Sequence, residues 1–188
     1  MNTFDALRQE FIQKRMLLSK NPEFQNCLND ALRNFINHLN VKTIGIYWPI
    51  RGELDARPAA LEWAKKDSSR ILALPIVKTN QPLIFAKWKE SDALIPGQYG
   101  IPEPQNNDSL QPIYPELIVL PCVAWSKQND QYWRIGYGGG YYDRTLHQYQ
   151  IDKRSIKTLG IAFKTLEVKE GDWHPQNHDQ ALDDLICI

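Results

Sequence analysis

The chain has 188 residues, and its 22 lysines and arginines are balanced by 22 aspartates and glutamates. This length predicts one domain over residues 1–188, and a hydrophobic content of 43% excludes extensive disorder. Because the formal net charge is zero, the chain has no overall field with which to bind nucleic acid or an anionic membrane nonspecifically. Any anionic ligand is therefore expected to occupy a local site.

Targeting and redox features point to the cytoplasm. The longest apolar run, Leu117–Trp125, contains a proline and is far shorter than a membrane span of about 20 residues. The first five residues lack the basic and apolar regions of a secretory signal. Three widely spaced cysteines form neither a disulfide framework nor a zinc site. We expect a cytoplasmic protein with no membrane, nucleic-acid or obligatory protein partner.

Two amphipathic helices are predicted at the start of the chain. In the first, an apolar stripe runs from Phe4 to Leu18, and the basic residues Arg8 and Arg15 lie outside it. The second helix begins at Pro22, and its apolar residues follow the i, i+3, i+4 rule over about four turns.

Short β-rich runs alternate with helices in the rest of the chain, which is the pattern of an α/β sheet. Helices are expected at Pro58–Lys66 and from Tyr141 to Tyr149. Residues 89–116 hold five of the 12 prolines and are expected to form a long surface loop. The expected strands and the last apolar run are Thr43–Tyr47, Ile71–Ile76, Leu83–Trp88, Leu117–Pro121, Thr158–Phe163 and Leu185–Ile188.

Four of the ten glycines lie within five residues, in the segment Arg134–Arg144. Successive glycines let backbone N–H groups converge on a phosphate, and a helix that begins at Tyr141 adds its positive end. Arginines flank this segment, and the carboxylate of Asp143 is suited to a divalent cation that bridges phosphates. These features favour a phosphate site over a glycine-rich hairpin or a flexible connection.

The common nucleotide-binding motifs do not fit this segment. A P-loop requires a Lys-Ser or Lys-Thr pair after the glycines, and none follows here. A dinucleotide-binding turn requires a later acidic residue at a strand end and lies early in its domain, whereas this segment lies late. The sequence therefore predicts a different scheme for binding phosphate.

Six blocks of the sequence form a recognisable set. They are Leu7-Arg8 with Arg15, Tyr47–Asp55, Gly100–Pro104, Leu120–Trp125, Arg134–Arg144 and His178–Asp183. In order and spacing they resemble the signature of the 5-formyltetrahydrofolate cyclo-ligase family, also called 5,10-methenyltetrahydrofolate synthetases. The resemblance spans essentially the whole chain.

The resemblance implies a three-layer α/β/α fold with a central mixed, mainly parallel sheet and an N-terminal pair of helices. It implies an enzyme of one-carbon metabolism that uses ATP and Mg²⁺ to close 5-formyltetrahydrofolate to 5,10-methenyltetrahydrofolate, with release of ADP and phosphate. ATP would phosphorylate the formyl oxygen, and N10 would attack the activated carbon. Positioning and charge stabilisation are then the main tasks of the protein.

The resemblance also implies roles for single residues. Arg134 and Tyr142 would be catalytic, and Asp143 and Asp179 would bind Mg²⁺. Glu53 would accept N–H bonds from the aminopyrimidine edge of the pterin. The ATP-binding residues would be Phe4, Arg8, Arg134, Ile135, Gly136, Tyr137, Gly138, Gly139, Gly140, Tyr141 and Tyr142. The folate-binding residues would be Trp48, Glu53, Tyr137, Gly138, Gly139, Gly140 and Tyr141.

The chain departs from the family's usual pattern at two places. Phe4 stands where a lysine is usual, and Trp125-Ser126 replaces Phe-Asp before a stretch, Lys127–Trp133, that is longer than usual. Two other functions stay open. One is a folate- or nucleotide-binding protein of the same fold without turnover. The other is a sugar-phosphate isomerase or acyl-CoA transferase on a similar sheet, which would need a catalytic carboxylate motif without this glycine segment.

Overall fold

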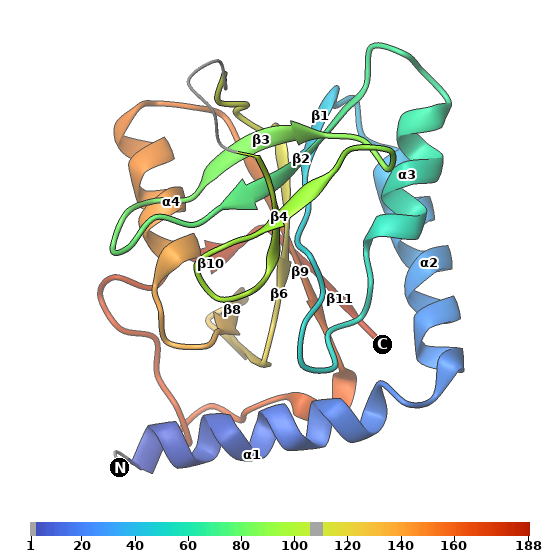
Figure 1. The fold of residues 1–188 in the computed structure, drawn as a ribbon. Coiled ribbons are helices and arrows are strands. Elements are labelled where there is room, and N and C mark those ends of the chain that lie inside the picture. Colours follow the sequence, from blue (N-terminus) through green and yellow to red (C-terminus); the bar gives the residue numbers. More distant parts are fainter. Residues whose placement is uncertain (1–2, 106–110) are drawn as a thin grey trace.

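A computed structural model of the chain describes residues 3–105 and 111–188 (Figure 1). The helices are α1 (Thr3–Leu18), α2 (Pro22–Asn37), α3 (Arg57–Lys65) and α4 (Tyr141–Ile151), with a 3-10 turn at Lys164–Leu166. The strands are β1 (Thr43–Gly45), β2 (Ile71–Ile76), β3 (Ile84–Trp88), β4 (Leu94–Pro96), β5 (Pro102–Pro104), β6 (Leu117–Pro121), β7 (Ala124–Gln128), β8 (Gln131–Ile135), β9 (Lys157–Ala162), β10 (Ala181–Leu182) and β11 (Asp184–Cys187).

The centre of the molecule is a sheet that has six strands in the described ranges, in the order β11-β9-β6-β1-β2-β3. Neighbouring strands are parallel except at one edge, where β3 pairs with β2 antiparallel. Every residue of β6 is buried, because a parallel strand covered on both faces consists of a continuous apolar run. The predicted mixed, mainly parallel sheet is confirmed.

Helices cover both faces of this main sheet (Figure 1). On one face, Leu32 and Ile36 of α2 and Trp63 of α3 pack on the strands. On the other face lie α4, through Leu146 and Tyr149, and a small sheet of the order β10-β8-β7. The predicted three-layer α/β/α architecture is confirmed.

Helix α1 lies across one end of the main sheet, whereas α2 lies along a face (Figure 1). The buried side chains of α1 include Ile12, which is 2% exposed, and Arg15, which is 1% exposed. The prediction that Arg15 lies outside the buried stripe is wrong. Its guanidinium is buried because carbonyl oxygens at the end of the sheet accept its N–H groups.

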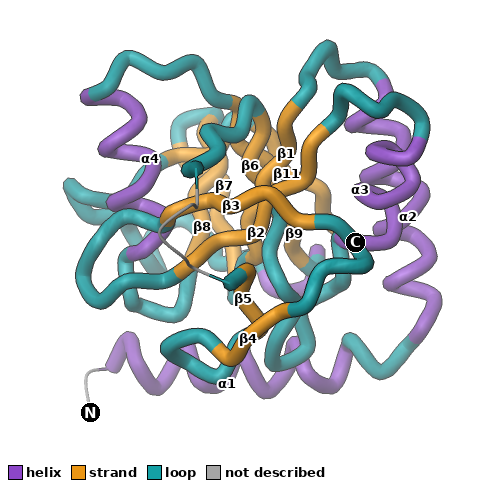
Figure 2. Tube along the Cα trace, turned by 45° about the horizontal axis from the view of Figure 1, so that its top comes forward, coloured by secondary structure: helices purple, strands orange, loops and turns teal. Residues whose placement is uncertain are grey.

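Part of the expected loop at 89–116 is a hairpin of β4 and β5, with Ile95 opposite Glu103. The prolines in this segment are typical of loops, but a short two-stranded hairpin tolerates them because few of its N–H groups are needed for pairing. The hairpin lies in front of the main sheet in Figures 1 and 2. Residues 106–110 of the expected loop lie outside the described residues.

A second hairpin, of β7 and β8, was not expected from the sequence and fills the stretch that is longer than usual in the family. Asn129 and Asp130 at its turn have φ angles of 50° and 60°, as a two-residue type I′ turn requires. Trp125 and Ser126, which depart from the family pattern, are buried in β7. The hairpin therefore leads the chain rigidly into the glycine segment that follows β8.

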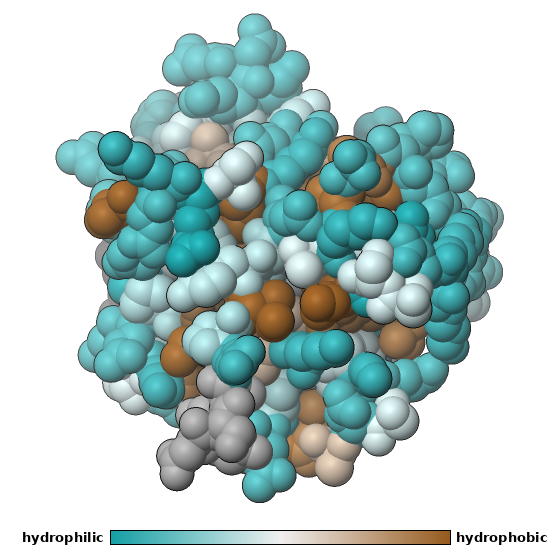
Figure 3. Space-filling view, turned by 90° about the horizontal axis from the view of Figure 1, so that it is seen from above, coloured by the Kyte–Doolittle hydropathy of each residue, from teal (hydrophilic) through white to brown (hydrophobic). Residues whose placement is uncertain are grey.

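In the described residues no helix combines the length and apolarity that crossing a bilayer requires. The face opposite α1 is mostly hydrophilic, with apolar residues in small separate groups (Figure 3).

Gly45 lies in the interior strand β1, where the core leaves no room for a side chain. A Cβ atom there would lie 2.7 Å from Cε1 of Phe85 and 2.9 Å from Cγ of Pro115. We expect Gly45→Ala to lower the free energy of unfolding by about 1–3 kcal/mol, because a methyl group added to a full core displaces its neighbours. In urea unfolding, Phe85→Leu in the same chain should recover part of the loss. Strictly additive losses would contradict this packing explanation.

Candidate active site

The glycine segment lies between the end of β8 and the start of α4. Gly138 and Gly140 have φ angles of +90° and +65°, a conformation that strains other residues, and Gly140 caps the N-terminus of α4. Arg144 in the first turn of α4 donates to the carbonyl of Gly139 at 2.8 Å. The glycines thus shape a tight turn at the positive end of a helix, the arrangement that suits phosphate.

Helix α1 contacts this glycine segment through Arg8. The Nε atom of Arg8 donates to the carbonyl of Gly136 at 2.8 Å, and an NH1–Oδ1 ion pair of 2.6 Å joins it to Asp5. The predicted ATP-binding residue Arg8 is therefore at the segment. The side chain of Phe4 lies outside the described part of the chain, and that of Ile135 is buried in the core, so only the backbone of Ile135 is suited to a ligand.

Arg134 and Asp143, at opposite ends of the glycine segment, form an ion pair of 2.9 Å between NH2 and Oδ2. Their side chains are 8% and 15% exposed, so the pair is only partly screened by water. The guanidinium carbon of Arg134 lies 5.2 Å from the ring centre of Tyr142, and burial raises the pKa of that phenol. The two residues predicted to be catalytic are thus brought together.

The structure brings the segment that holds Asp179 to Asp143, the other residue predicted to bind metal. The backbone N–H of Gln180 lies 3.4 Å from Oδ1 of Asp143, which places Asp143 beside the residue after Asp179. Asp179 accepts the N–H of Gln176 through Oδ2. In the described part of the chain no group of three or more His, Cys, Asp or Glu side chains is arranged as a metal cage. Carboxylates beside a turn that suits phosphate would fit Mg²⁺, which is often held by one or two carboxylates together with phosphate oxygens.

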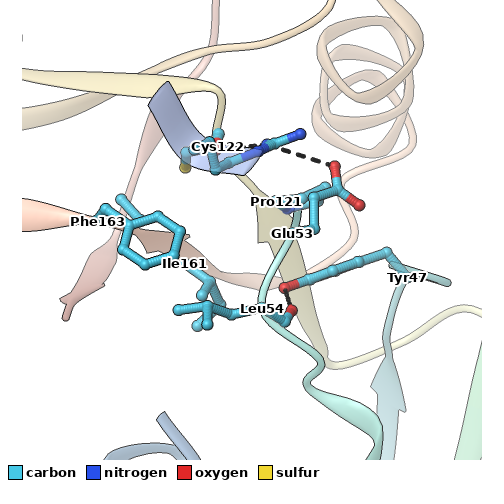
Figure 4. A pocket seen from close by; sticks show the side chains of 9 residues that line it. Tyr47, Glu53, Leu54, Pro121, Cys122, Ile161 and Phe163 are labelled. Atoms are coloured by element: carbon cyan, nitrogen blue, oxygen red, sulfur yellow. Dashed lines mark hydrogen bonds and ion pairs between the residues drawn. The ribbon is translucent and has the colours of Figure 1, made fainter. Parts of the chain in front are cut away.

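Glu53 is buried at the end of the main sheet that α1 covers. Its side chain is 3% exposed, and Figure 4 shows it between Cys122 and Tyr47. Its Oε2 atom accepts the N–H of Ile50 at 2.9 Å, and its Oε1 atom accepts the hydroxyl of Tyr137 at 3.0 Å. The predicted folate residue Glu53 therefore touches the glycine segment directly.

A small cavity of about 10 Å³ adjoins Glu53, with Tyr47, Cys122 and Phe163 among its lining residues (Figure 4). This is about the room that one water molecule needs. Burial raises the pKa of the Cys122 thiol to about 12, so this cysteine stays protonated and unreactive at neutral pH. A pteridine ring is much larger than this cavity.

Burial raises the pKa of Glu53 from its usual 4.5 to about 7, although the charge of Arg15 and the donors Ile50 and Tyr137 act in the opposite direction. Between pH 4.5 and 7 the folded chain therefore holds this proton more tightly than the unfolded chain. By linkage, stability falls as the pH rises through this window, by up to about 3 kcal/mol.

We expect Glu53→Gln to remove this dependence, because glutamine does not titrate. Urea unfolding of both proteins at pH 5 and pH 8 measures it, and the wild type should lose stability relative to the variant at pH 8. Parallel pH profiles would show that Glu53 titrates normally.

Trp48 and Tyr141 are turned toward other partners than Glu53. The guanidinium of Arg57 covers the Trp48 ring at 3.8 Å, and the Trp88 ring meets it edge-on at 6.3 Å. The Tyr141 hydroxyl lies 2.7 Å from that of Tyr99, at the tip of the β4–β5 hairpin. The structure thus packs Trp48 against Arg57 and Trp88, and it connects the glycine segment to a hairpin that the sequence did not predict.

Arg15 is the site residue that sequence reasoning missed. Its NH1 atom lies 3.6 Å from Oε1 of Glu53, and its NH2 group donates to the Tyr137 hydroxyl. One signal was present in the sequence. Arg15 follows Arg8 by seven residues, which places both on the same face of a helix.

Comparisons with known proteins agree with this geometry. A sequence model of the 5-formyltetrahydrofolate cyclo-ligase family matches residues 1–187. A 5-formyltetrahydrofolate cyclo-ligase of Mycoplasma pneumoniae is 28% identical over 185 residues, which cover 97% of this chain and 96% of the relative. One of Haemophilus influenzae is 29% identical over 160 residues, 81% of this chain and 79% of the relative.

Solved structures show the same likeness. A 5,10-methenyltetrahydrofolate synthetase from Mycoplasma pneumoniae has a TM-score of 0.72 at 25% identity and covers 99% of this chain and 98% of its own. The synthetase from Aquifex aeolicus has a TM-score of 0.71 at 25% identity, and the match covers 97% of this chain and 88% of that protein's chain. Since the family model matches nearly every residue, the chain belongs to the 5-formyltetrahydrofolate cyclo-ligase family.

Proposed function

We propose that this chain catalyses the ATP-dependent ring closure of 5-formyltetrahydrofolate to 5,10-methenyltetrahydrofolate, with release of ADP and phosphate. The family match supports the reaction. The observation that carries it is the contact between Tyr137, in the phosphate-binding turn, and Glu53, the predicted pterin residue. This contact supports a short distance between the two predicted binding sites, as a phosphoryl transfer between their ligands requires.

The chemistry starts from an unreactive amide, because the formyl oxygen on N5 is a poor leaving group. The formyl oxygen attacks the γ-phosphorus of ATP, so that an O–P bond forms and the bond to ADP breaks. N10 then attacks the formyl carbon, and phosphate leaves with the oxygen as N10 loses its proton. Each step moves negative charge onto phosphate oxygens, so groups that stabilise this charge lower the barrier.

The residues at the turn supply that stabilisation. Backbone N–H groups of Gly138, Gly139 and Gly140 at the start of α4 would bind the phosphates, and Arg134 would neutralise charge on the transferred phosphoryl group. Asp143 and Asp179 would hold Mg²⁺, which when bound neutralises phosphate charge and orients the triphosphate. Glu53 would accept two N–H bonds from the aminopyrimidine edge and so set the position of N5.

The test is incubation of the purified protein with 5-formyltetrahydrofolate, ATP and Mg²⁺ while methenyl absorbance and ADP are measured. We expect one ADP for each methenyl product, and no product when either ATP or Mg²⁺ is omitted. Product without nucleotide would overturn the cyclo-ligase assignment. Binding of folate and ATP without any product would favour the binding protein without turnover.

A further inference from the structure

The inference concerns Arg15, a charged side chain that is 1% exposed at the end of α1. A charge buried this deeply is costly unless every donor and the charge itself have partners. The neighbouring Lys14 on the same helix is 54% exposed and pairs with Glu10 on the surface. The burial of Arg15 is therefore a specific feature of this position and not of the basic helix as a whole.

The guanidinium of Arg15 is anchored by backbone carbonyls from two loops. Its Nε and NH2 atoms donate to the carbonyl of Arg51, at 3.3 Å and 3.1 Å, and its NH1 atom donates to that of Cys122 at 2.9 Å. Arg51 lies in the loop between β1 and α3, and Cys122 directly follows β6, the strand beside β1 in the main sheet. None of these bonds is made to the Glu53 side chain, and the bond to Cys122 lies outside the loop that carries Glu53, so the cation keeps an anchor there when the surroundings of Glu53 change.

Arg15 also reaches Glu53 in two ways. Its NH1 atom lies 3.6 Å from Oε1 of Glu53, and its NH2 group donates to the Tyr137 hydroxyl, which in turn donates to Oε1. The ionisable groups that act on Glu53 from all sides are Arg15 of α1, Tyr47 after β1, Arg134 of β8, Tyr137 of the glycine segment and Tyr142 of α4. Of the two cations, only Arg15 forms an ion pair with Glu53.

Tyr137 is the partner of Glu53 that a substrate is able to replace. It is half-buried, lies in a turn of glycines and reaches Oε1 through its hydroxyl alone. The Ile50 N–H belongs to the same tight loop as Glu53, and Arg15 is held by three carbonyl bonds. An N–H donor that binds Oε1 where the Tyr137 hydroxyl now binds takes the place of that hydroxyl.

We propose that Arg15 is the positioning residue of the folate site: it favours the carboxylate form of Glu53 and keeps that carboxylate aimed while pterin N–H groups replace the Tyr137 hydroxyl. This inference rests on the proposed function, because it takes Glu53 as the pterin acceptor. Arg15 itself touches neither the substrate nor the reacting atoms in this scheme and acts through Glu53.

The role of Arg15 has a consequence for pH that a purely structural role lacks. Burial alone favours the protonated form of Glu53, and the charge of Arg15 favours the carboxylate. Only the carboxylate accepts two N–H bonds from the pterin. Removal of Arg15 therefore raises the pH at which folate binding reaches half of its maximum.

The experiment is calorimetric titration with 5-formyltetrahydrofolate from pH 6 to pH 9 on the wild type, Arg15→Met, Arg15→Lys and the control Lys14→Met. We expect Arg15→Met to weaken binding at pH 7.5 by about 10-fold to 100-fold and to raise the midpoint by about one pH unit. Arg15→Lys should keep the midpoint near that of the wild type, since it keeps the charge, while it binds more weakly because an ammonium cannot reproduce the planar fork. Lys14→Met should match the wild type.

A double-mutant cycle with Glu53→Gln completes the test, and it also removes the unpaired buried charge that would endanger the folding of Arg15→Met. We expect Arg15→Met to cost little further folate affinity when Glu53 is already glutamine. An equal loss in both backgrounds, or an unchanged pH midpoint in Arg15→Met and Arg15→Lys, would overturn the inference. Because binding is measured without turnover, a wild type that binds folate but forms no methenyl product would contradict the proposed function and leave this test of Arg15 valid.

Discussion

Arg134→Met is expected to lower kcat for methenyl formation by about 10³-fold, the range seen when an arginine that stabilises a transferred phosphoryl group is lost. Arg134 is well placed for this task because it lies at the entrance to the glycine segment, 8% exposed, with its charge only partly screened. Its partner Asp143 is 15% exposed and has the Gln180 N–H nearby, so the fold should survive the substitution.

Initial rates at saturating ATP and folate, together with thermal melts, measure this effect. Arg134→Lys should recover part of the rate, because it restores the charge but not the bidentate geometry. Lys127→Met, which removes an exposed charge on the neighbouring strand β7, is the control and should leave the rate unchanged. A rate within a few-fold of the wild type in Arg134→Met would remove Arg134 from the reaction.

Asp143→Asn is expected to lower kcat by about 10²-fold and to raise the Mg²⁺ concentration needed for half-maximal rate. Asparagine keeps the size of the side chain and an oxygen that accepts the Gln180 N–H, so stability should change little. It removes the charge that suits Asp143 to a divalent cation. Folate affinity should persist, because Asp143 is not among the groups that contact Glu53.

The decisive measurement is the initial rate as a function of Mg²⁺ at saturating ATP and folate. Asp143→Asn also breaks the ion pair with Arg134, but Arg134→Met breaks the same pair without removing a proposed metal ligand. A raised Mg²⁺ requirement in Asp143→Asn that is absent in Arg134→Met would assign the metal to Asp143. Asp172→Asn, an exposed carboxylate in a distant turn, serves as the control for loss of charge. An unchanged Mg²⁺ requirement would reject the metal role.

The proposed sites lie close together, and this places several ionisable groups away from water in the ligand-free protein, which costs free energy. Glu53 is a buried carboxylate whose pKa is raised to about 7, and its neighbours Tyr137 and Tyr142 are partly buried phenols whose pKa values are raised as well. Groups held this far from their ordinary protonation behaviour are typical of functional sites, because the desolvation that disfavours the ligand-free state also strengthens contacts with a charged or polar ligand.

The order of elements was largely predictable from local sequence. The runs Ile71–Ile76 and Leu117–Pro121 become β2 and β6 with the predicted bounds, and the second helix starts at Pro22 as predicted. The β4–β5 hairpin was not predictable, because proline and glycine in Gly97–Pro104 carry the composition of a loop. Short strands have few periodic residues, so their pairing is decided by partners elsewhere in the chain.

The sequence by itself determined the fold class, the position of the glycine turn and the family, because each depends on residues close together in the chain: apolar periodicity, clustered glycines and short motifs. Only the tertiary structure decided how these parts form one site. Arg15 meets Arg51, Cys122 and Tyr137, which lie 36, 107 and 122 residues further along the chain. Such a buried cation is stable only where folding brings carbonyls and a carboxylate around it, and no local pattern records that arrangement.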